Sequence, residues 1–401
     1  MTKTGCGRII RGKIKKGGVK KGPNKEAKRN KMSTSSSPDS ECSSSLLEEP
    51  PGSRDSEKLI TEFKNLSSLI SEKDFHSVTA TYPFVSTEYY FSLASPSLTD
   101  PIMLQLCPQR KELEEEWGGM EDPLDEEGMS PVPGLVHRYP DRVLMVITNI
   151  CFMNCRHCTR KRLWREGRRP RTLDEIRRMI DYIREHKKIR DVILSGGDPL
   201  TFSDMMLEMI IREIRSISHV EIIRIGSRAP VVKPSRITKE FAHMISKYRP
   251  VWLNTQFNHI REITPESSQA VQTILEAGVP VNNQSVLLKE INNTAEDILA
   301  LCHGLLKIGV RPYYLFHCDP VSGTAHFRTS ISEGMEIIKK MRGYTSGLAV
   351  PTFVVDAVGG GGKIPLHPET LVSKMGGKMV IRNYSGKCFM YDDYNREVLK
   401  I

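Results

Sequence analysis

From residue 143 onward, short apolar runs alternate with amphipathic segments, and this alternation limits the fold more than any other feature of the chain. Runs rich in Val and Ile predict strands, whereas apolar residues that recur every three or four positions predict helices. The predicted strands are 143–148, 190–195, 220–225, 251–256, 280–286 and 311–317. The predicted helices are 172–187, 203–217, 238–248, 265–277, 294–308 and 331–342.

Six strand–helix units in a row predict parallel strands joined by right-handed crossovers. An open doubly wound sheet and a partial barrel both fit this pattern. In either architecture the chemistry belongs at the carboxyl ends of the strands, so we expect an active site at that edge. Polar residues follow five of the predicted strands there: a cysteine cluster after the first, Ser195–Asp198 after the second, Ser227 and Arg228 after the third, Asn258 and His259 after the fourth, and Asp319 after the sixth.

Composition divides the chain into four regions. Residues 1–56 are rich in Lys, Gly and Ser, and because they cannot bury enough apolar surface to offset chain entropy, we expect a disordered tail. Residues 57–140 alternate helical stretches with Pro and acidic loops, which predicts an N-terminal helical section. Residues 141–343 hold the strand–helix units, and residues 344–401 form a C-terminal segment.

The formal net charge of +10 comes from the tail, because residues 1–32 contain twelve Lys or Arg and one acid. The rest of the chain is close to neutral, so we do not expect a nucleic-acid partner for the folded part. No stretch approaches the roughly 18–20 uninterrupted apolar residues of a membrane helix, so no membrane partner is expected. No apolar segment follows the basic start as it would in a secretory signal, and we expect a cytoplasmic protein.

Three of the nine cysteines form the cluster Cys151-x3-Cys155-x2-Cys158, directly after the first predicted strand. Thiolates are ligands for zinc and for iron–sulfur clusters. Structural zinc normally takes four ligands in two separated pairs, and this loop offers three with no second pair nearby. A four-iron cluster held by three thiolates keeps one iron open for another ligand, so the spacing favours a cluster over zinc or free thiols.

Lys363 follows a run of four glycines, residues 359–362. Glycine lets the backbone approach a ligand closely. An amine held in a tight, partly desolvated turn has a lowered pKa and can form a Schiff base with an aldehyde such as pyridoxal phosphate. A flexible loop ending in a solvated lysine fits the same residues, and the turn by itself does not decide between the two.

Taken together, these segments resemble the lysine 2,3-aminomutase family of the radical S-adenosylmethionine superfamily. The resemblance extends from about residue 60 to about residue 385 and includes CFMNCRHCTRKR, ILSGGDPL, RIGSRAPVV, NNQSVLL, RPYYLFHCD and PTFVVDAVGGGGK. It implies a partial (β/α)6 TIM-like barrel of the radical SAM type, with an N-terminal helical section and a C-terminal extension that binds pyridoxal phosphate.

The resemblance also assigns roles to individual residues. Cys151, Cys155 and Cys158 match the ligands of a 4Fe-4S cluster. The positions that match S-adenosylmethionine contacts are His157, Ser195, Gly196, Gly197, Asp198 and Gln284. Those that match pyridoxal phosphate contacts are Lys363, which carries the cofactor and is the catalytic residue, with Arg138 and Arg142. Those that match substrate contacts are Arg160 for the α-carboxylate, with Asp319 and Asp356 for the distal ammonium.

The implied reaction is an isomerisation of L-lysine to L-β-lysine (3,6-diaminohexanoate), in which a 5′-deoxyadenosyl radical starts a 1,2-shift of the amino group on a pyridoxal phosphate aldimine. The implied partners are a small-molecule amino acid substrate, an electron donor of the flavodoxin or ferredoxin type, and further copies of the chain in a homo-oligomer. Arginine or another amino acid remains an alternative substrate. An RNA-modifying radical enzyme that uses the basic tail is the alternative of a different class.

Two departures from the family pattern qualify the resemblance. Gln256 stands where lysine aminomutases usually have His, near the S-adenosylmethionine site. The chain has no Cys-rich C-terminal tail, and Thr294 replaces the cysteine that would partner it in an intersubunit zinc site. We therefore expect assembly without that zinc site.

Overall fold

A nine-stranded sheet forms the centre of the protein, whose computed structural model describes residues 59–114, 119–375 and 377–393. The predicted tail, residues 1–56, lies outside the described residues. The strands are β3 (Leu135–Tyr139), β4 (Arg142–Thr148), β5 (Asp191–Gly196), β6 (Ile222–Gly226), β7 (Val251–Thr255), β8 (Val281–Leu287), β9 (Arg311–His317), β10 (Thr352–Ala357) and β11 (Gly362–Leu366).

The strands lie side by side in sequence order. From β4 to β10 every neighbouring pair is parallel, while β3 and β11 close the two edges as antiparallel strands. All six predicted strands lie within this parallel set, and β10 adds a seventh that the sequence did not predict. The prediction of a partial barrel of strand–helix units is confirmed.

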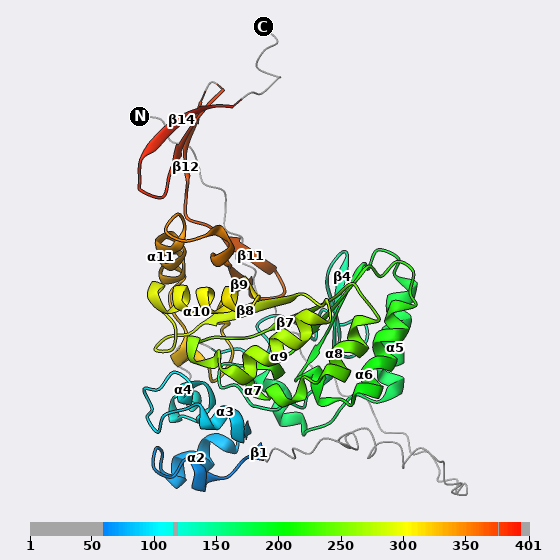
Figure 1. The fold of residues 1–401 in the computed structure, drawn as a ribbon. Coiled ribbons are helices and arrows are strands. Elements are labelled where there is room, and N and C mark those ends of the chain that lie inside the picture. Colours follow the sequence, from blue (N-terminus) through cyan, green and yellow to red (C-terminus); the bar gives the residue numbers. More distant parts are fainter. Residues whose placement is uncertain (1–58, 115–118, 376, 394–401) are drawn as a thin grey trace, which may run out of the picture. The chain divides into compact units, whose positions relative to one another are not determined.

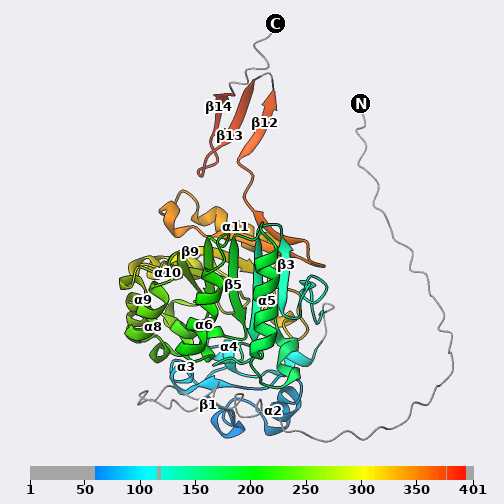
Figure 2. The same ribbon diagram turned by 90° about the vertical axis from the view of Figure 1, so that its right-hand side faces the viewer.

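Helices connect the parallel strands and follow one another along the outer side of the sheet (Figures 1 and 2). They are α5 (Leu173–Glu185), α6 (Asp204–Arg215), α7 (Ala229–Val232), α8 (Lys239–Ser246), α9 (Pro265–Glu276), α10 (Ala295–Lys307) and α11 (Ile331–Met341). Helix α5 shows why the sequence folds this way. Thr172 and Glu175 form a reciprocal capping box at its start. Its buried residues fall on one face: Ile176, Met179, Ile180 and Ile183.

The two faces of the sheet have different side chains because residues alternate along each strand. On β5, Val192 and Leu194 are buried in the core beneath the helices. Their neighbours Ile193 and Ser195, on the other face, line an internal cavity instead. The same alternation on β8 buries Val281 and Leu287. The strands thus build a core on the outer face and a binding space on the inner one.

The N-terminal section consists of short elements that pack against the start of the barrel. These are β1 (Leu59–Ile60), η2 (Phe63–Asn65), α2 (Glu72–Thr79), β2 (Ser86–Thr87), α3 (Glu88–Ser92), α4 (Met103–Leu106) and η3 (Arg110–Leu113). Helix α4 and the loop before β2 contact the cysteine segment directly. Asn154 N donates to Val85 O at 2.9 Å, and Arg156 N donates to Gln105 O at 2.9 Å.

Several 3-10 turns complete the connections: η4 (Lys161–Glu166), η5 (Pro199–Thr201), η6 (Pro234–Arg236), η7 (Ile260–Glu262), η8 (Ala325–Phe327) and η9 (Gly347–Ala349). After β11 a separate antiparallel sheet contains β12 (Leu371–Met375), β13 (Lys378–Arg382) and β14 (Cys388–Asp392). Strands β10 and β11 therefore continue the barrel sheet beyond residue 343. Among the described residues, none of the helices has the length and apolar character needed to cross a membrane.

Candidate active site

A cavity of about 560 Å³ opens on the inner face of the sheet and at the carboxyl ends of its strands. This volume lies in the usual range for a small-molecule site. Every residue to which the sequence assigned a role lines it: Arg138, Arg142, Cys151, Cys155, His157, Cys158, Arg160, Ser195, Gly196, Gly197, Asp198, Gln284, Asp319, Asp356 and Lys363. The structure thus brings the predicted residues together, although it does not by itself assign their roles.

The three thiols of Cys151, Cys155 and Cys158 lie close enough to affect one another. Burial, and then the neighbouring Cys155, raise the pKa of Cys158 to about 11. Burial, Cys158 and Asp198 raise the pKa of Cys151 well above its usual range. The described residues nevertheless contain no group of three metal-binding side chains that could share one ion. In a multi-iron cluster each thiolate binds a different iron, so three thiols on one loop are suited to hold such a cluster.

A buried ion cluster supports the loop that carries these cysteines. Glu112 lies between two cations, with Arg156 Nη2 at 2.6 Å and Lys161 Nζ at 2.7 Å from its Oε2 atom. All three side chains are at most 1% exposed. Burial lowers the pKa of Lys161 to about 8 although Glu112 acts in the opposite direction. The loop is therefore anchored from beneath by two cations that share one carboxylate.

The turn Ser195–Asp198 packs directly on the backbone that enters the cysteine loop. Gly197 N donates to Thr148 O at 2.6 Å, and a Cβ at Gly197 would lie 2.2 Å from Ile150 O. Glycine is thus required there by close backbone approach. The Asp198 carboxylate accepts from Leu200 N, Ser227 Oγ and Arg228 N, so it fixes the neighbouring loops.

Two cavity residues carry buried nitrogen atoms with no hydrogen-bond partner in the described part of the chain: His157 Nδ1 and Arg138 Nε. Burial, and then Arg228, lower the pKa of His157 well below its usual range, so the ring is neutral. Its Nε2 atom lies 3.2 Å from Asn258 Nδ2. Since the amide nitrogen must donate, Nε2 accepts and Nδ1 carries the proton. Buried donors of this kind normally have partners, so both nitrogens are suited to bind a ligand.

Arg160 is held in one orientation by Glu126, a residue to which the sequence assigned no role. The carboxylate accepts from Arg160 Nε at 2.9 Å and from Arg160 Nη2 at 2.7 Å, and Arg162 also binds it. Burial alone would raise the pKa of Glu126, but Arg160 and Arg162 lower it to about 2. Arg160 Nη1 makes only longer contacts, 3.3 Å to Ser195 Oγ. The outer edge of the guanidinium, on the side of Nη1, can therefore donate hydrogen bonds to a second carboxylate.

Lys363 and Asp356 face each other across the antiparallel pair β10–β11. Lys363 Nζ lies 2.8 Å from Asp356 Oδ2, and the Lys363 backbone N–H donates to Tyr139 Oη at 2.8 Å. Asp319 lines the same cavity, and Thr159 donates to it at 3.1 Å. Burial, and then Asp356, raise the pKa of Asp319 to about 7. Two carboxyl groups thus accompany one amine.

Further cations lie along the start of the strands. The Arg142 guanidinium stacks on the Tyr139 ring, 3.8 Å from its centroid, and Arg142 Nη1 binds Asp141 Oδ1 at 2.9 Å. Arg224, which the sequence did not single out, lines the same cavity and pairs with Asp191 at 2.7 Å. Guanidinium groups on a cavity wall suit a phosphate or carboxylate.

Sequence reasoning missed the residues that hold the site residues in place. Glu112 and Glu126 belong to the acidic loops of the N-terminal section, and neither follows a strand of the barrel. Their contacts with Arg156 and Arg160 are long-range, so no local pattern predicts that they support the site. Arg228 was noted as a residue after the third strand, but without a role.

Comparisons with known proteins agree with the site. A model of the lysine-2,3-aminomutase family matches residues 338–398, and a model of the radical SAM superfamily matches residues 145–302. The L-lysine 2,3-aminomutase of Clostridium subterminale is 52% identical over 77% of this chain and 74% of its own length. That of Fusobacterium nucleatum is 50% identical over 77% of this chain and 72% of its own.

A relative with a different substrate in its name is somewhat less similar. The glutamate 2,3-aminomutase of Clostridioides difficile is 44% identical over 83% of this chain and 80% of its own length. Identity of this degree over most of each sequence exceeds what a shared fold alone requires. The chain belongs to the lysine 2,3-aminomutase family of the radical SAM superfamily.

Proposed function

We propose that the chain is an L-lysine 2,3-aminomutase, which converts L-lysine to L-β-lysine. The observation that carries the choice of substrate is the pair of acids beside Lys363. A buried ammonium needs a carboxylate partner, since an unpaired one costs several kcal/mol. Asp319 and Asp356 offer two carboxylates against one lysine of the protein. They would attract the side chain of lysine and repel that of glutamate.

The family works with a 4Fe-4S cluster, S-adenosylmethionine and pyridoxal phosphate, and the residues of this cavity fit all three. Cys151, Cys155 and Cys158 would hold the cluster, and the unpartnered His157 Nδ1 is a donor for S-adenosylmethionine. Lys363 would hold the aldehyde of pyridoxal phosphate, with Arg138 near its phosphate. When bound, these groups supply a carbon-centred radical and an electrophilic carbon for the amino group.

The side chains of the protein orient the substrate and set the protonation of the reacting amine. The outer edge of the Arg160 guanidinium binds the substrate α-carboxylate, because Glu126 occupies the inner edge and prevents rotation. Lys363 Nζ acts as a nucleophile only after it loses a proton. Asp356, 2.8 Å away, lies within proton-transfer distance of that atom.

The partners follow from the same proposal. Reduction of the cluster requires a one-electron donor, for which we propose a protein of the flavodoxin or ferredoxin type. We also propose a homo-oligomer without an intersubunit zinc site. The residue at position 294 is a threonine whose hydroxyl caps helix α10 by accepting from Asp297 N, so it offers no thiolate for zinc.

The decisive experiment is anaerobic incubation of the reconstituted protein with lysine, arginine or glutamate, followed by detection of β-amino acids by mass spectrometry. We expect β-lysine from lysine and no product from glutamate. A β-amino acid formed from arginine in preference to lysine would replace the proposed substrate, and no product from any of the three would refute the proposal.

Lys363→Ala tests the assignment of the pyridoxal phosphate lysine. Because no other lysine faces Asp356 in the described part of the site, the variant should lose the visible absorbance of lysine-bound pyridoxal phosphate together with turnover. Lys289→Ala, which changes an exposed lysine, is the matched control and should keep both. Retention of the absorbance in Lys363→Ala would mean that another lysine holds the cofactor.

A further inference from the structure

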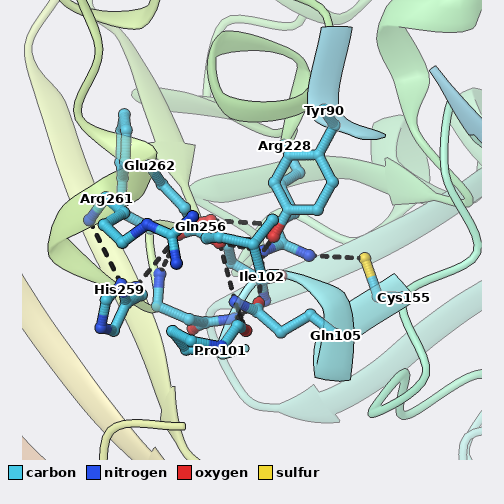
Figure 3. A network of polar contacts seen from close by, with 12 residues as sticks. Tyr90, Pro101, Ile102, Gln105, Cys155, Arg228, Gln256, His259, Arg261 and Glu262 are labelled. Atoms are coloured by element: carbon cyan, nitrogen blue, oxygen red, sulfur yellow. Dashed lines mark hydrogen bonds and ion pairs between the residues drawn. The ribbon is translucent and has the colours of Figure 1, made fainter. Parts of the chain in front are cut away.

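Arg228 places a buried guanidinium directly on one of the three thiols. It follows strand β6, is 7% exposed, and its Nη1 atom lies 2.8 Å from Cys155 Sγ (Figure 3). The Nε atom of Arg228 donates to Gln256 O at 3.1 Å. Its Nη2 atom lies close to three further side-chain oxygens: Gln105 Oε1 at 2.6 Å, Glu262 Oε1 at 2.9 Å and Tyr90 Oη at 3.2 Å. The side chain is therefore fixed in position rather than merely near the sulfur.

Glu262 only partly offsets the charge of Arg228, because it is shared among several donors. Glu262 Oε1 also accepts from Tyr90 Oη at 2.7 Å and from Gln105 Nε2 at 3.0 Å. Its Oε2 atom accepts the backbone N–H groups of Asn258 and His259. A carboxylate that stabilises five donors leaves positive charge at Nη1, on the side of Cys155.

The neighbouring thiol has a different environment. Cys158 Sγ accepts the neutral backbone N–H of Arg160 at 3.3 Å. Cys155 instead accepts from a cation that is removed from water, and electrostatic effects are strongest there because the local dielectric is low. Of the two thiols, Cys155 is thus the one that the protein equips to carry extra negative charge.

We propose that Arg228 is a positioning residue that fixes Cys155 and raises the reduction potential of the 4Fe-4S cluster. This inference rests on the proposed function, in which Cys155 is a cluster ligand. One electron from the reductant enters the cluster and makes it more negative by one charge, while the guanidinium keeps its proton throughout. Hydrogen bonds to the ligand sulfurs and net local charge set the potentials of such clusters. The fixed cation therefore stabilises the reduced form more than the oxidised form.

The test is an anaerobic redox titration of the reconstituted full-length protein with dithionite and mediators, followed by electron paramagnetic resonance of the reduced cluster. Arg228→Gln should shift the midpoint potential to a more negative value. The matched control is Arg190→Gln, because Arg190 is exposed and pairs with Glu221 rather than with a sulfur. It should keep the wild-type midpoint, since an exposed charge is screened by solvent.

Glu262→Gln provides a second variant with the opposite expected sign. It removes the anion that offsets Arg228, so the midpoint potential should become more positive. If Arg228→Gln does not fold, this variant alone still tests whether the charge of Arg228 sets the potential. An unchanged midpoint in the variants that retain a cluster, or an equal shift in Arg190→Gln, would overturn the inference. A wild-type protein that binds no cluster would instead refute the proposed function, so the two failures are distinguishable.

Discussion

The two ends of the cavity place opposite charges beside their functional side chains. Around the cysteine loop, the buried cations Arg156, Lys161 and Arg228 pair with Glu112 and Glu262, and Arg228 also contacts Cys155 Sγ, while a third buried carboxylate, Asp198, accepts only from neutral donors. We call this set the cysteine end. At the other end, two acids, Asp319 and Asp356, accompany the single amine of Lys363. We call that set the lysine end.

This difference indicates what each end binds. An uncompensated buried charge is costly, so a stable site receives a ligand of opposite sign. A cluster held by three thiolates brings negative charge to the cysteine end, and a substrate ammonium brings positive charge to the lysine end. The charged side chains at each end thus suit ligands of the charges that the family uses: Arg228 faces the thiol of Cys155, and two acids face the amine of Lys363.

Glu112→Gln gives the largest expected effect, because it leaves Arg156 and Lys161 buried without a carboxylate. Breaking a buried ion pair on one side typically lowers the free energy of unfolding by about 3–5 kcal/mol. Urea unfolding of the cluster-free protein measures this loss. If the cysteine end is completed by a negative cluster, the loss should be smaller in the reconstituted protein.

The control for this variant is Glu221→Gln, which breaks a surface pair with Arg190 in which both side chains are more than half exposed. Such pairs contribute little, so no comparable change is expected. An equal loss of stability for Glu112→Gln with and without the cluster would break the comparison, because the cluster would then not compensate the buried cations.

Asp356→Asn tests the lysine end and should weaken the binding only of substrates whose side chain carries an ammonium group. Removing one carboxylate of a buried charge pair weakens binding by about 2–3 kcal/mol, roughly 30- to 150-fold. We expect this loss for lysine but not for norleucine, which lacks the distal ammonium. The dissociation constants of lysine and norleucine, measured for wild type and for Asp356→Asn, check this difference in binding. Asp191→Asn, which changes another acid that lines the cavity, is the control. Equal weakening of lysine and norleucine would remove Asp356 from the specificity site.

The sequence predicted the barrel, and it selected side chains that the structure brings to one cavity, because both depend on local patterns. The alternation in β5 and the capping box at Thr172 are readable within a few residues. Likewise, the spacing from Cys151 to Cys158 is a property of one loop. Strand β10 was missed because its run, Thr352–Ala357, was read as part of a cofactor segment rather than as a barrel strand.

The pairing of these charges was beyond sequence reasoning because it arises from distant partners. Glu112 and Glu126 come from the N-terminal section, yet they bind Arg156 within the cysteine loop and Arg160 just after it. Similarly, Glu262 reaches Arg228 only because the loops after β6 and β7 converge. Local patterns predict which residue types react, whereas the contacts that orient and charge them require the folded chain.

The pH dependence of lysine binding gives the smallest expected effect and examines the lysine end without a change of sequence. Burial and Asp356 raise the pKa of Asp319 to about 7. Below that pH the free carboxyl is protonated and neutral, so it cannot pair with the ammonium. The substrate side chain stays charged because its own pKa is about 10. Affinity for lysine should therefore rise with pH through about 7 and then level off, with a change of at most about tenfold per pH unit.

Binding should also release a proton below this pH, because the bound ammonium lowers the pKa of Asp319. Titration calorimetry in buffers of different ionisation enthalpy measures that proton directly. Asp319→Asn should bind lysine more weakly at high pH and lose the pH dependence, while norleucine should show little dependence in either protein. If Asp319→Asn keeps the wild-type profile, another group titrates, and the pairing with the ammonium at the lysine end must be assigned to Asp356 alone.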